Sequence, residues 1–256
     1  MNKSWNFWRL GYWIAGIVLA ITSEAYGEPA HFEGKLVIEF KEAGNRLVLL
    51  EDYRYFDQNY KMWTARKGLI TDGASIPRWA WSFIGSPLGA PYVNAAIIHD
   101  QYCVLRTEKP EDAHKMFYDA MIVAGVDKLK AKLMYAAVYA AGPWWDWRTI
   151  ENARQAFQNT YYGDAWAKQL ETPHLQPPKE MFKKGTDGKP LICNDGCSWT
   201  DLVNLQDDWI STHVPIAARK ALSTQEQDAV TTYVQTHART VDEIKSFVDH
   251  LRNGAP

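Results

Sequence analysis

The sequence predicts an α+β fold: a small N-terminal antiparallel meander packed on a helical hairpin core, followed by a helical C-terminal extension. Residues 32–66 are rich in β-branched and aromatic side chains and are interrupted by short turn signals, which is typical of strands. From Pro91 onward, apolar residues instead recur at helical spacing. Residues 171–197 are rich in Pro, Gly and Lys and indicate a long loop before the last helical part.

The N-terminus has the layout of a secretory signal. Lys3 and Arg9 precede an uncharged, mostly apolar run over residues 10–22, and Ala25-Tyr26-Gly27 offers a small-x-small cleavage site. The run is shorter than the roughly 20 residues that a spanning helix needs, although an uncleaved membrane anchor is the alternative. We therefore expect residues 1–27 to be a signal peptide or N-terminal anchor, and the protein to be periplasmic or secreted.

The remaining chain divides into a domain over residues 28–165 and a loop-rich, helical extension over residues 166–256. The formal net charge of −2 over 256 residues gives no basic footprint for nucleic acid. Within the first domain, the strand-like stretches are "FEGKLVIEF", "RLVLLEDYRYF" and "KMWTAR". Helices are expected from Pro91 to about Arg106, from Pro110 to about Ala124, from about Asp127 to Ala141, over "WWDWRTIENARQAFQNTYY", and in an amphipathic tail over about 223–251.

The three cysteines separate into a pair and a single residue. Cys193 and Cys197 bracket an Asp-Gly turn, so a disulfide between them is expected in an oxidising compartment. The spacing does not give a complete zinc set. Cys103 then remains as a free, buried thiol.

His99 and Asp100 stand side by side in the middle of an apolar helix. A buried polar group costs free energy unless it has a partner, so the pair calls for an explanation. The short connection before Pro110 makes the two helices antiparallel, which brings His114 and Asp119 within about one turn of the level of His99. Either residue could meet His99 across the hairpin.

This arrangement could support chemistry. A His held by a carboxylate has a fixed tautomer and can take a proton from water. The candidate catalytic residues are His99, His114 and Asp119. Asp100, with Asp72 as a second ligand, could hold an oxygen-seeking cation such as calcium. Tyr102 and Arg106 share the helix face of His99 and are candidates for binding substrate. The alternative is a structural network in which the same polar residues only stabilise the helix hairpin.

Two motifs resemble a known family. "TDGASIPRWAWSFIGSP" over residues 71–87, followed by "AAIIHDQY" over residues 95–102, is similar to the bacterial and phage family called domain of unknown function 1353. The resemblance covers about residues 33–142. It implies a shared fold, while the activity of that family is not established.

A second resemblance is to the secreted phospholipase A2 superfamily, in which one helix carries His-Asp-x-Tyr and its partner helix carries Asp-x-x-Phe. It implies that His99 is a general base and that Asp100 is a calcium ligand. The orienting Asp of that superfamily would fall at position 114, three residues before Phe117, where this chain has His. Its glycine-rich calcium loop is also missing in its usual form.

Two classes of function follow from these features. The first is an exported hydrolase with a His-Asp site on a helix hairpin, acting on phospholipid with calcium or on another polymer of the cell envelope. The second is a non-catalytic envelope or phage-derived module, in which the same pair stabilises a binding or structural surface. In both cases the expected partner is lipid or cell-envelope material and no nucleic acid.

Overall fold

The computed structural model describes residues 29–41, 46–71, 77, 79, 91–161, 199–236 and 239–254. In the N-terminal part, short strands form two antiparallel sheets of three strands each. One sheet has the order β1-β4-β5 and the other has the order β2-β3-β6. Their bounds are β1 His31–Glu33, β2 Ile38–Lys41, β3 Arg46–Leu49, β4 Tyr53–Phe56, β5 Met62–Ala65 and β6 Ile70–Thr71.

The α+β class is confirmed, but the strands are arranged differently from one continuous meander. β1 pairs with β4 instead of its sequence neighbour, with Phe32 opposite Tyr55, and β3 pairs with β6, with Leu47 opposite Thr71. Alternate residues of β3 and β4, such as Leu47 and Tyr55, are buried against the helices. The strand-like composition of the sequence therefore located β1 to β5, while their pairing depends on which buried faces meet.

A turn at residues 57–59 joins β4 to β5. The Asp57 carboxylate accepts hydrogen bonds from the backbone N–H of Asn59 at 2.8 Å and of Lys61 at 3.0 Å. It also accepts one from the indole N–H of Trp63 at 3.1 Å. A short polar side chain that bonds to the following backbone is the usual way in which Asp favours a turn.

The helical hairpin core consists of α2 (Val93–Leu105), α3 (Pro110–Val123) and α4 (Lys128–Ala141), close to the predicted bounds. α2 ends at Arg106, which has a left-handed backbone conformation with φ 55°. α3 begins with Pro at its first position, and Gly125 with φ 83° follows its end. Asp127 then caps α4 by accepting hydrogen bonds from the backbone N–H groups of Leu129 and Lys130.

The later helices are α5 (Trp147–Tyr161), α7 (Trp199–His213), α8 (Thr224–Thr236) and α9 (Val241–Asn253). α7 has no counterpart in the sequence-based prediction. The predicted single amphipathic tail is two helices, because Thr240 forms a capping box with Glu243 and so begins a new helix at α9. Gly254, with φ 58°, follows the end of α9.

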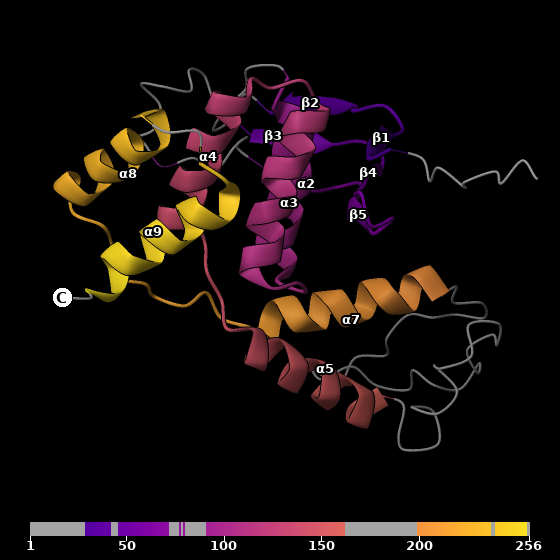
Figure 1. Cartoon of the computed structure of the whole chain (residues 1–256). Helices are drawn as coiled ribbons and strands as arrows, with labels where there is room; N and C mark the ends of the chain where they lie inside the picture. The colour runs from indigo at the N-terminus through magenta and orange to yellow at the C-terminus, as the bar shows by residue number, and fades with distance from the viewer. Residues whose placement is uncertain are drawn as a thin grey trace, which may run out of the picture.

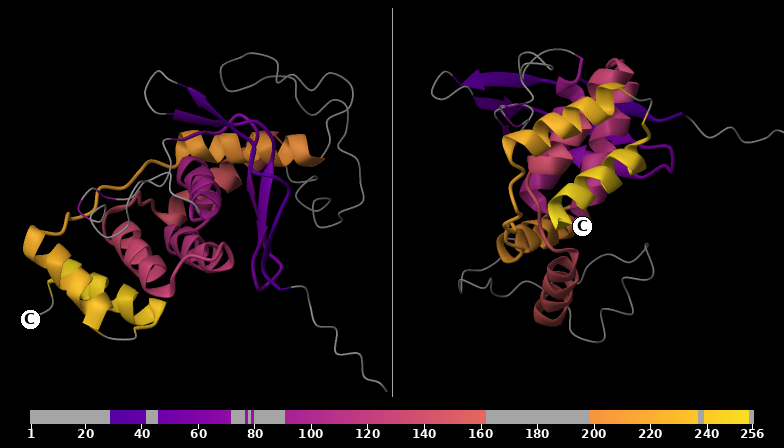
Figure 2. Two further views of the ribbon diagram at one scale, coloured as in Figure 1. Left: turned by 90° about the horizontal axis from the view of Figure 1, so that it is seen from above. Right: turned by 60° about the vertical axis from the view of Figure 1, so that its left-hand side comes forward.

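α2 lies at the centre of the molecule, between the sheets, α3 and α7 (Figure 1). The main apolar core joins the sheets to α2, α3 and α4, with Ile97, Phe117 and Leu49 among its fully buried members. A second core joins α4 to α8 and α9, and a third joins α2 and α3 to α5 and α7. Figure 2 shows α8 and α9 on the side of the molecule away from the strands.

Several expectations fall on residues outside the described ranges: the leader over residues 1–27, Asp72, and the Cys193–Cys197 pair. The domain boundary near residue 165 also stays a prediction. Among the described residues, no helix combines the length and the apolar character that crossing a membrane requires. Cys103 is a buried, free thiol, as the sequence predicted.

Candidate functional site

Three consecutive polar residues of α2 are buried, and each contacts a different neighbour. His99 contacts α3 through His114, and the Asp100 carboxylate accepts a hydrogen bond from the Thr71 hydroxyl of β6. Gln101 accepts a hydrogen bond from the backbone N–H of Arg66, just after β5, at 2.9 Å. Because a helix turns by about 100° per residue, adjacent side chains of a central helix reach different elements. The partners remove most of the free energy cost of burying these groups.

The contact between His99 and His114 fixes the ring tautomers. His114 Nε2 lies 3.1 Å from the backbone carbonyl oxygen of Pro143, and a carbonyl oxygen can only accept, so Nε2 carries the proton. In neutral His114, Nδ1 is then an acceptor. His99 Nε2 lies 2.9 Å from this Nδ1 and must therefore be the donor. His99 Nδ1 is left as the atom that can gain or lose a proton.

The two imidazoles have opposite electrostatic environments, although both are fully buried. Burial lowers the pKa of His99, but the Cys103 sulfur and the Asp100 carboxylate outweigh it, and the net pKa is raised above the ordinary 6.5. Burial, the neighbouring His99 and the more distant Arg219 lower the pKa of His114 well below 6.5. The pair therefore holds its added proton on His99, next to the carboxylate.

His99 Nδ1 faces two side chains that reach a pocket. It lies 3.8 Å from Asp100 Oδ1 and 3.8 Å from Cys103 Sγ. The nitrogen–oxygen distance is too long for a direct hydrogen bond and is one at which a bridging water should be considered. Cys103 Sγ is almost equally far from His99 Nε2, at 3.6 Å, so it does not lie along the lone pair of either ring nitrogen.

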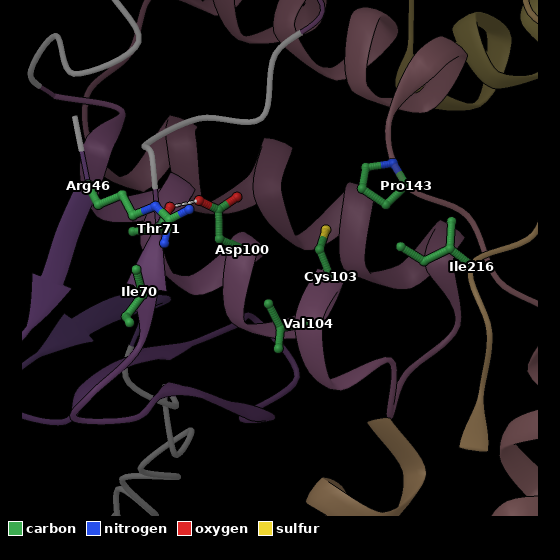
Figure 3. Close-up of a pocket in the computed structure, with 8 residues that line it drawn as sticks. All are labelled: Arg46, Ile70, Thr71, Asp100, Cys103, Val104, Pro143 and Ile216. Carbon is green, nitrogen blue, oxygen red and sulfur yellow. Dashed lines mark hydrogen bonds between the residues drawn. The ribbon is translucent and has the colours of Figure 1, made fainter. Parts of the chain in front are cut away.

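The pocket has a volume of about 520 Å³, within the range typical of small-molecule sites. It runs from the strands, across α2, to the segments that follow α4 and α7 (Figure 3). Half of its lining is polar and half is apolar. The polar members are Arg46, Thr71, Asp100 and Cys103, and the apolar members are Ile70, Val104, Pro143 and Ile216.

The structure places the sequence-predicted site residues in different regions. His99, His114 and Asp100 are brought together. Asp119 lies on the outer face of α3, where its carboxylate pairs with Lys115 Nζ at 2.6 Å. The Tyr102 hydroxyl accepts a hydrogen bond from the backbone N–H of Thr64, and Arg106 donates to the backbone carbonyl of Ser211 in α7. Tyr102 and Arg106 thus contact other elements, and neither lines the pocket.

A calcium ion needs several oxygen ligands in one place. Among the described residues, no group of three or more His, Cys, Asp or Glu side chains is placed to hold a metal ion. Asp100 is the one carboxylate among the described pocket residues, and one of its oxygens accepts a hydrogen bond from the Thr71 hydroxyl. Calcium takes six to eight oxygen ligands. The described residues alone supply too few oxygen ligands for calcium, and calcium binding that includes Asp72 stays a prediction.

Sequence reasoning did not assign Arg46, Thr71 or Ile216 to the site. These residues lie far from α2 in the sequence and reach it only because β3 pairs with β6 and because the segment after α7 returns to α4. Cys103 could have been found, since it lies one helical turn after His99 and so shares its face. The other three carry no local signal.

Part of the chain matches a protein family of unknown function. Residues 47–138 match the family described as "Protein of unknown function (DUF1353)". "Uncharacterized protein y4iH" of Sinorhizobium fredii (strain NBRC 101917 / NGR234) is 45% identical over 98 residues, which cover 38% of this chain and 41% of the relative. "Uncharacterized protein y4jT" of the same strain is 41% identical over 136 residues, covering 52% of this chain and 40% of the relative.

The chain therefore spans about two fifths of the length of these curated relatives. No solved structure matches the chain. The matched range contains β3 except its first residue, β4 to β6, α2, α3 and most of α4, and so includes both members of the histidine pair and Asp100. Over residues 47–138, the chain is similar to the DUF1353 family, whose function is unknown.

Proposed function

We propose that this protein is a hydrolase in which His99 is the general base and the pocket beside Asp100 receives the substrate. The observation that carries the proposal is the chain of hydrogen bonds from Pro143 through His114 to His99. It leaves His99 Nδ1 as the basic atom, 3.8 Å from a carboxylate that lines the pocket. A ring with a fixed tautomer and a carboxylate beside its free nitrogen is suited to general base catalysis.

The proposed step uses the side chains of this chain alone. His99 Nδ1 accepts a proton from a water molecule, whose oxygen attacks the carbonyl carbon of an ester in the pocket. Asp100 stabilises the imidazolium that forms, and the same proton then passes to the leaving alcohol. His114 Nδ1 accepts a hydrogen bond from His99 Nε2–H and so keeps the His99 ring in place. In phospholipase A2 a carboxylate orients the catalytic His in this way.

The pH dependence follows from the charge environment. Because Asp100 and Cys103 raise the pKa of His99, the basic form becomes more populated as the pH rises above neutrality. We therefore expect kcat/KM to increase with pH, with an apparent pKa above 6.5. Asp100→Asn removes one source of the shift and should lower that apparent pKa.

With the leader expected at residues 1–27, we place this activity beyond the inner membrane, on phospholipid or another ester-bearing envelope polymer. The test measures release of nitrophenol from p-nitrophenyl butyrate and of fatty acid from phosphatidylglycerol vesicles, with and without added calcium. His99→Gln should reduce the rate by about 100- to 10,000-fold. His250→Gln, the same substitution at an exposed site on α9, is the matched control and should leave the rate unchanged.

The second candidate function is a non-catalytic binding or structural module. It is favoured by the fact that His99, Asp100 and Gln101 each hold α2 to a different element. Thermal melts of the same variants separate the two candidates. If the wild type hydrolyses neither substrate, and His99→Gln changes only the melting temperature, the histidine pair is structural and the module is the better description.

A further inference from the structure

The apolar part of the pocket is aliphatic and exposed. Ile70, Val104 and Ile216 are 55%, 51% and 58% exposed, although large aliphatic side chains are usually buried. Single exposed aliphatic residues are common and need no explanation. Here three of them come from β6, from α2 and from the segment after α7, and they line one pocket together with Pro143. Their convergence gives the pocket an apolar wall suited to a flexible alkyl chain.

Arg46 supplies a positive charge at the strand side of the same pocket (Figure 3). It is the first residue of β3, opposite Lys41 of β2. Within the described part of the chain, the Arg46 guanidinium forms no ion pair, whereas Arg54, Arg66 and Arg154 each pair with a carboxylate. A guanidinium presents a planar set of donors that matches a carboxylate or a phosphate.

The wall at the other end of the pocket is fixed by the C-terminal extension. The backbone N–H of Ala217 donates to the Trp144 carbonyl at 2.6 Å, next to Pro143. The Arg219 guanidinium lies 3.5 Å from the centre of the Trp144 ring and donates to the Tyr139 carbonyl. These contacts hold Ile216 beside Pro143. Arg46, Pro143 and Ile216 all lie outside the range of the family match, 47–138.

We infer that the pocket binds an anionic amphiphile, with its carboxylate or phosphate group at Arg46 and its alkyl chain along Ile70, Val104 and Ile216. This names the substrate class of the proposed hydrolase and rests on that proposal for the role of the pocket. It assigns Arg46 and Ile216 as residues that determine specificity. Asp100, at the polar side of the pocket, disfavours a second negative charge near His99 and so helps to orient the ligand.

The test compares three ligands with the same ten-carbon chain and different head groups: decanoate, decyl phosphate and decyltrimethylammonium, each below its micelle concentration. Binding to the full exported chain is measured by titration calorimetry. Both anions should bind more tightly than the cation, and the better of the two identifies the preferred head group. Arg46→Gln should weaken binding of the anions by roughly 5- to 20-fold, with little effect on the cation.

The variants have matched controls elsewhere on the surface. Arg148→Gln removes an exposed Arg from α5, and Leu129→Ser removes an exposed aliphatic residue from α4. Neither change should alter decanoate binding. Ile216→Ser should weaken binding of all three ligands by several fold, because each loses contact with the apolar wall. Both Arg46 and Ile216 are exposed, so their replacement leaves the core intact.

Equal affinity for the three head groups, or an unchanged affinity in Arg46→Gln, overturns the inference. Its failure can be told apart from failure of the proposed function. If His99→Gln abolishes ester hydrolysis while Arg46→Gln and Ile216→Ser leave the kinetics with phosphatidylglycerol, an anionic ester, unchanged, the hydrolase stands and the substrate class is wrong. If the anions bind through Arg46 but no ester is hydrolysed, the site is a binding site and the hydrolase is wrong.

Discussion

The two faces of α3 carry similar chemical groups in very different environments. On the inner face, His114 is fully buried and bonds to His99 and to the Pro143 carbonyl. On the outer face, Asp119 pairs with Lys115, and the two side chains are 33% and 55% exposed. Residues 114 and 119 are about 140° apart by the helical period, so they cannot both face α2. One helix thus separates a candidate site from an ordinary surface.

The exposed Asp119–Lys115 pair and the buried His99–His114 pair differ in their access to water. On the outer face, water solvates both charges and screens their attraction, so the ion pair contributes little. On the inner face, no water compensates for a lost partner, and a small change in charge or hydrogen bonding has a large effect. Because both histidines are buried, the groups around them shift each pKa away from 6.5. The pKa of His99 is raised and the pKa of His114 is lowered.

The largest expected effect on stability comes from breaking the inner pair. His114→Leu fills the space but leaves the His99 Nε2–H and the Pro143 carbonyl without a partner. Each buried unsatisfied group costs about 1–3 kcal/mol, so the loss of two partners should lower the free energy of unfolding by about 2–6 kcal/mol. Urea denaturation measures the change, and His250→Leu on α9 is the exposed control. A loss below about 0.5 kcal/mol is incompatible with the pair as described.

The next effect is a stability maximum in the pH range of the histidine pair. His99 has a folded-state pKa above 6.5, so the stability it contributes is complete below pH 6.5 and declines as the pH rises beyond that value. His114 has a folded-state pKa below 6.5, so the stability it contributes is complete above pH 6.5 and declines as the pH falls. The two slopes predict a maximum near pH 6.5.

Melting temperatures recorded across this range test the pair directly. His99→Gln should remove the decline on the alkaline side, and His114→Gln should remove the decline on the acidic side. The control is again the exposed His250, whose replacement by Gln should leave both slopes in place. A wild-type profile that rises steadily through pH 6.5 would show that other groups dominate and that the two shifts are smaller than the geometry indicates.

The sequence contained enough information to find the hairpin and His99, but less to choose its partner. His114 shares a helical stripe with Phe117 and Met121, which are both buried, whereas Asp119 does not. Weighting that apolar stripe would have favoured His114 over Asp119. Local patterns determine such faces, because burial of apolar side chains orients a helix.

The rest of the site depends on contacts between distant segments. Thr71 meets Asp100 because β6 pairs with β3, and Ile216 reaches the pocket because the chain after α7 returns to Trp144. Strand pairing and the path of a long connection are decided by the whole core, so no window of sequence reveals them. For the same reason the three predicted strand-like stretches cover β1 to β5, whereas β6 and the division into two sheets were not predicted.

The smallest expected effect concerns the outer face of α3 and tests whether Asp119 has any part in the candidate site. Asp119→Asn removes the ion pair with Lys115. An exposed pair of this kind contributes about 0.3–0.5 kcal/mol to the stability of the fold, so the free energy of unfolding should fall by that amount. Because the carboxylate is not in contact with His99, ester hydrolysis and its pH profile should be unchanged. The variant is measured beside His99→Gln in the same assays, with Lys115→Gln as the partner control. If Asp119→Asn lowered kcat/KM by tenfold or more while Lys115→Gln did not, the outer face would contain part of the site, and His114 would no longer be the residue that orients His99.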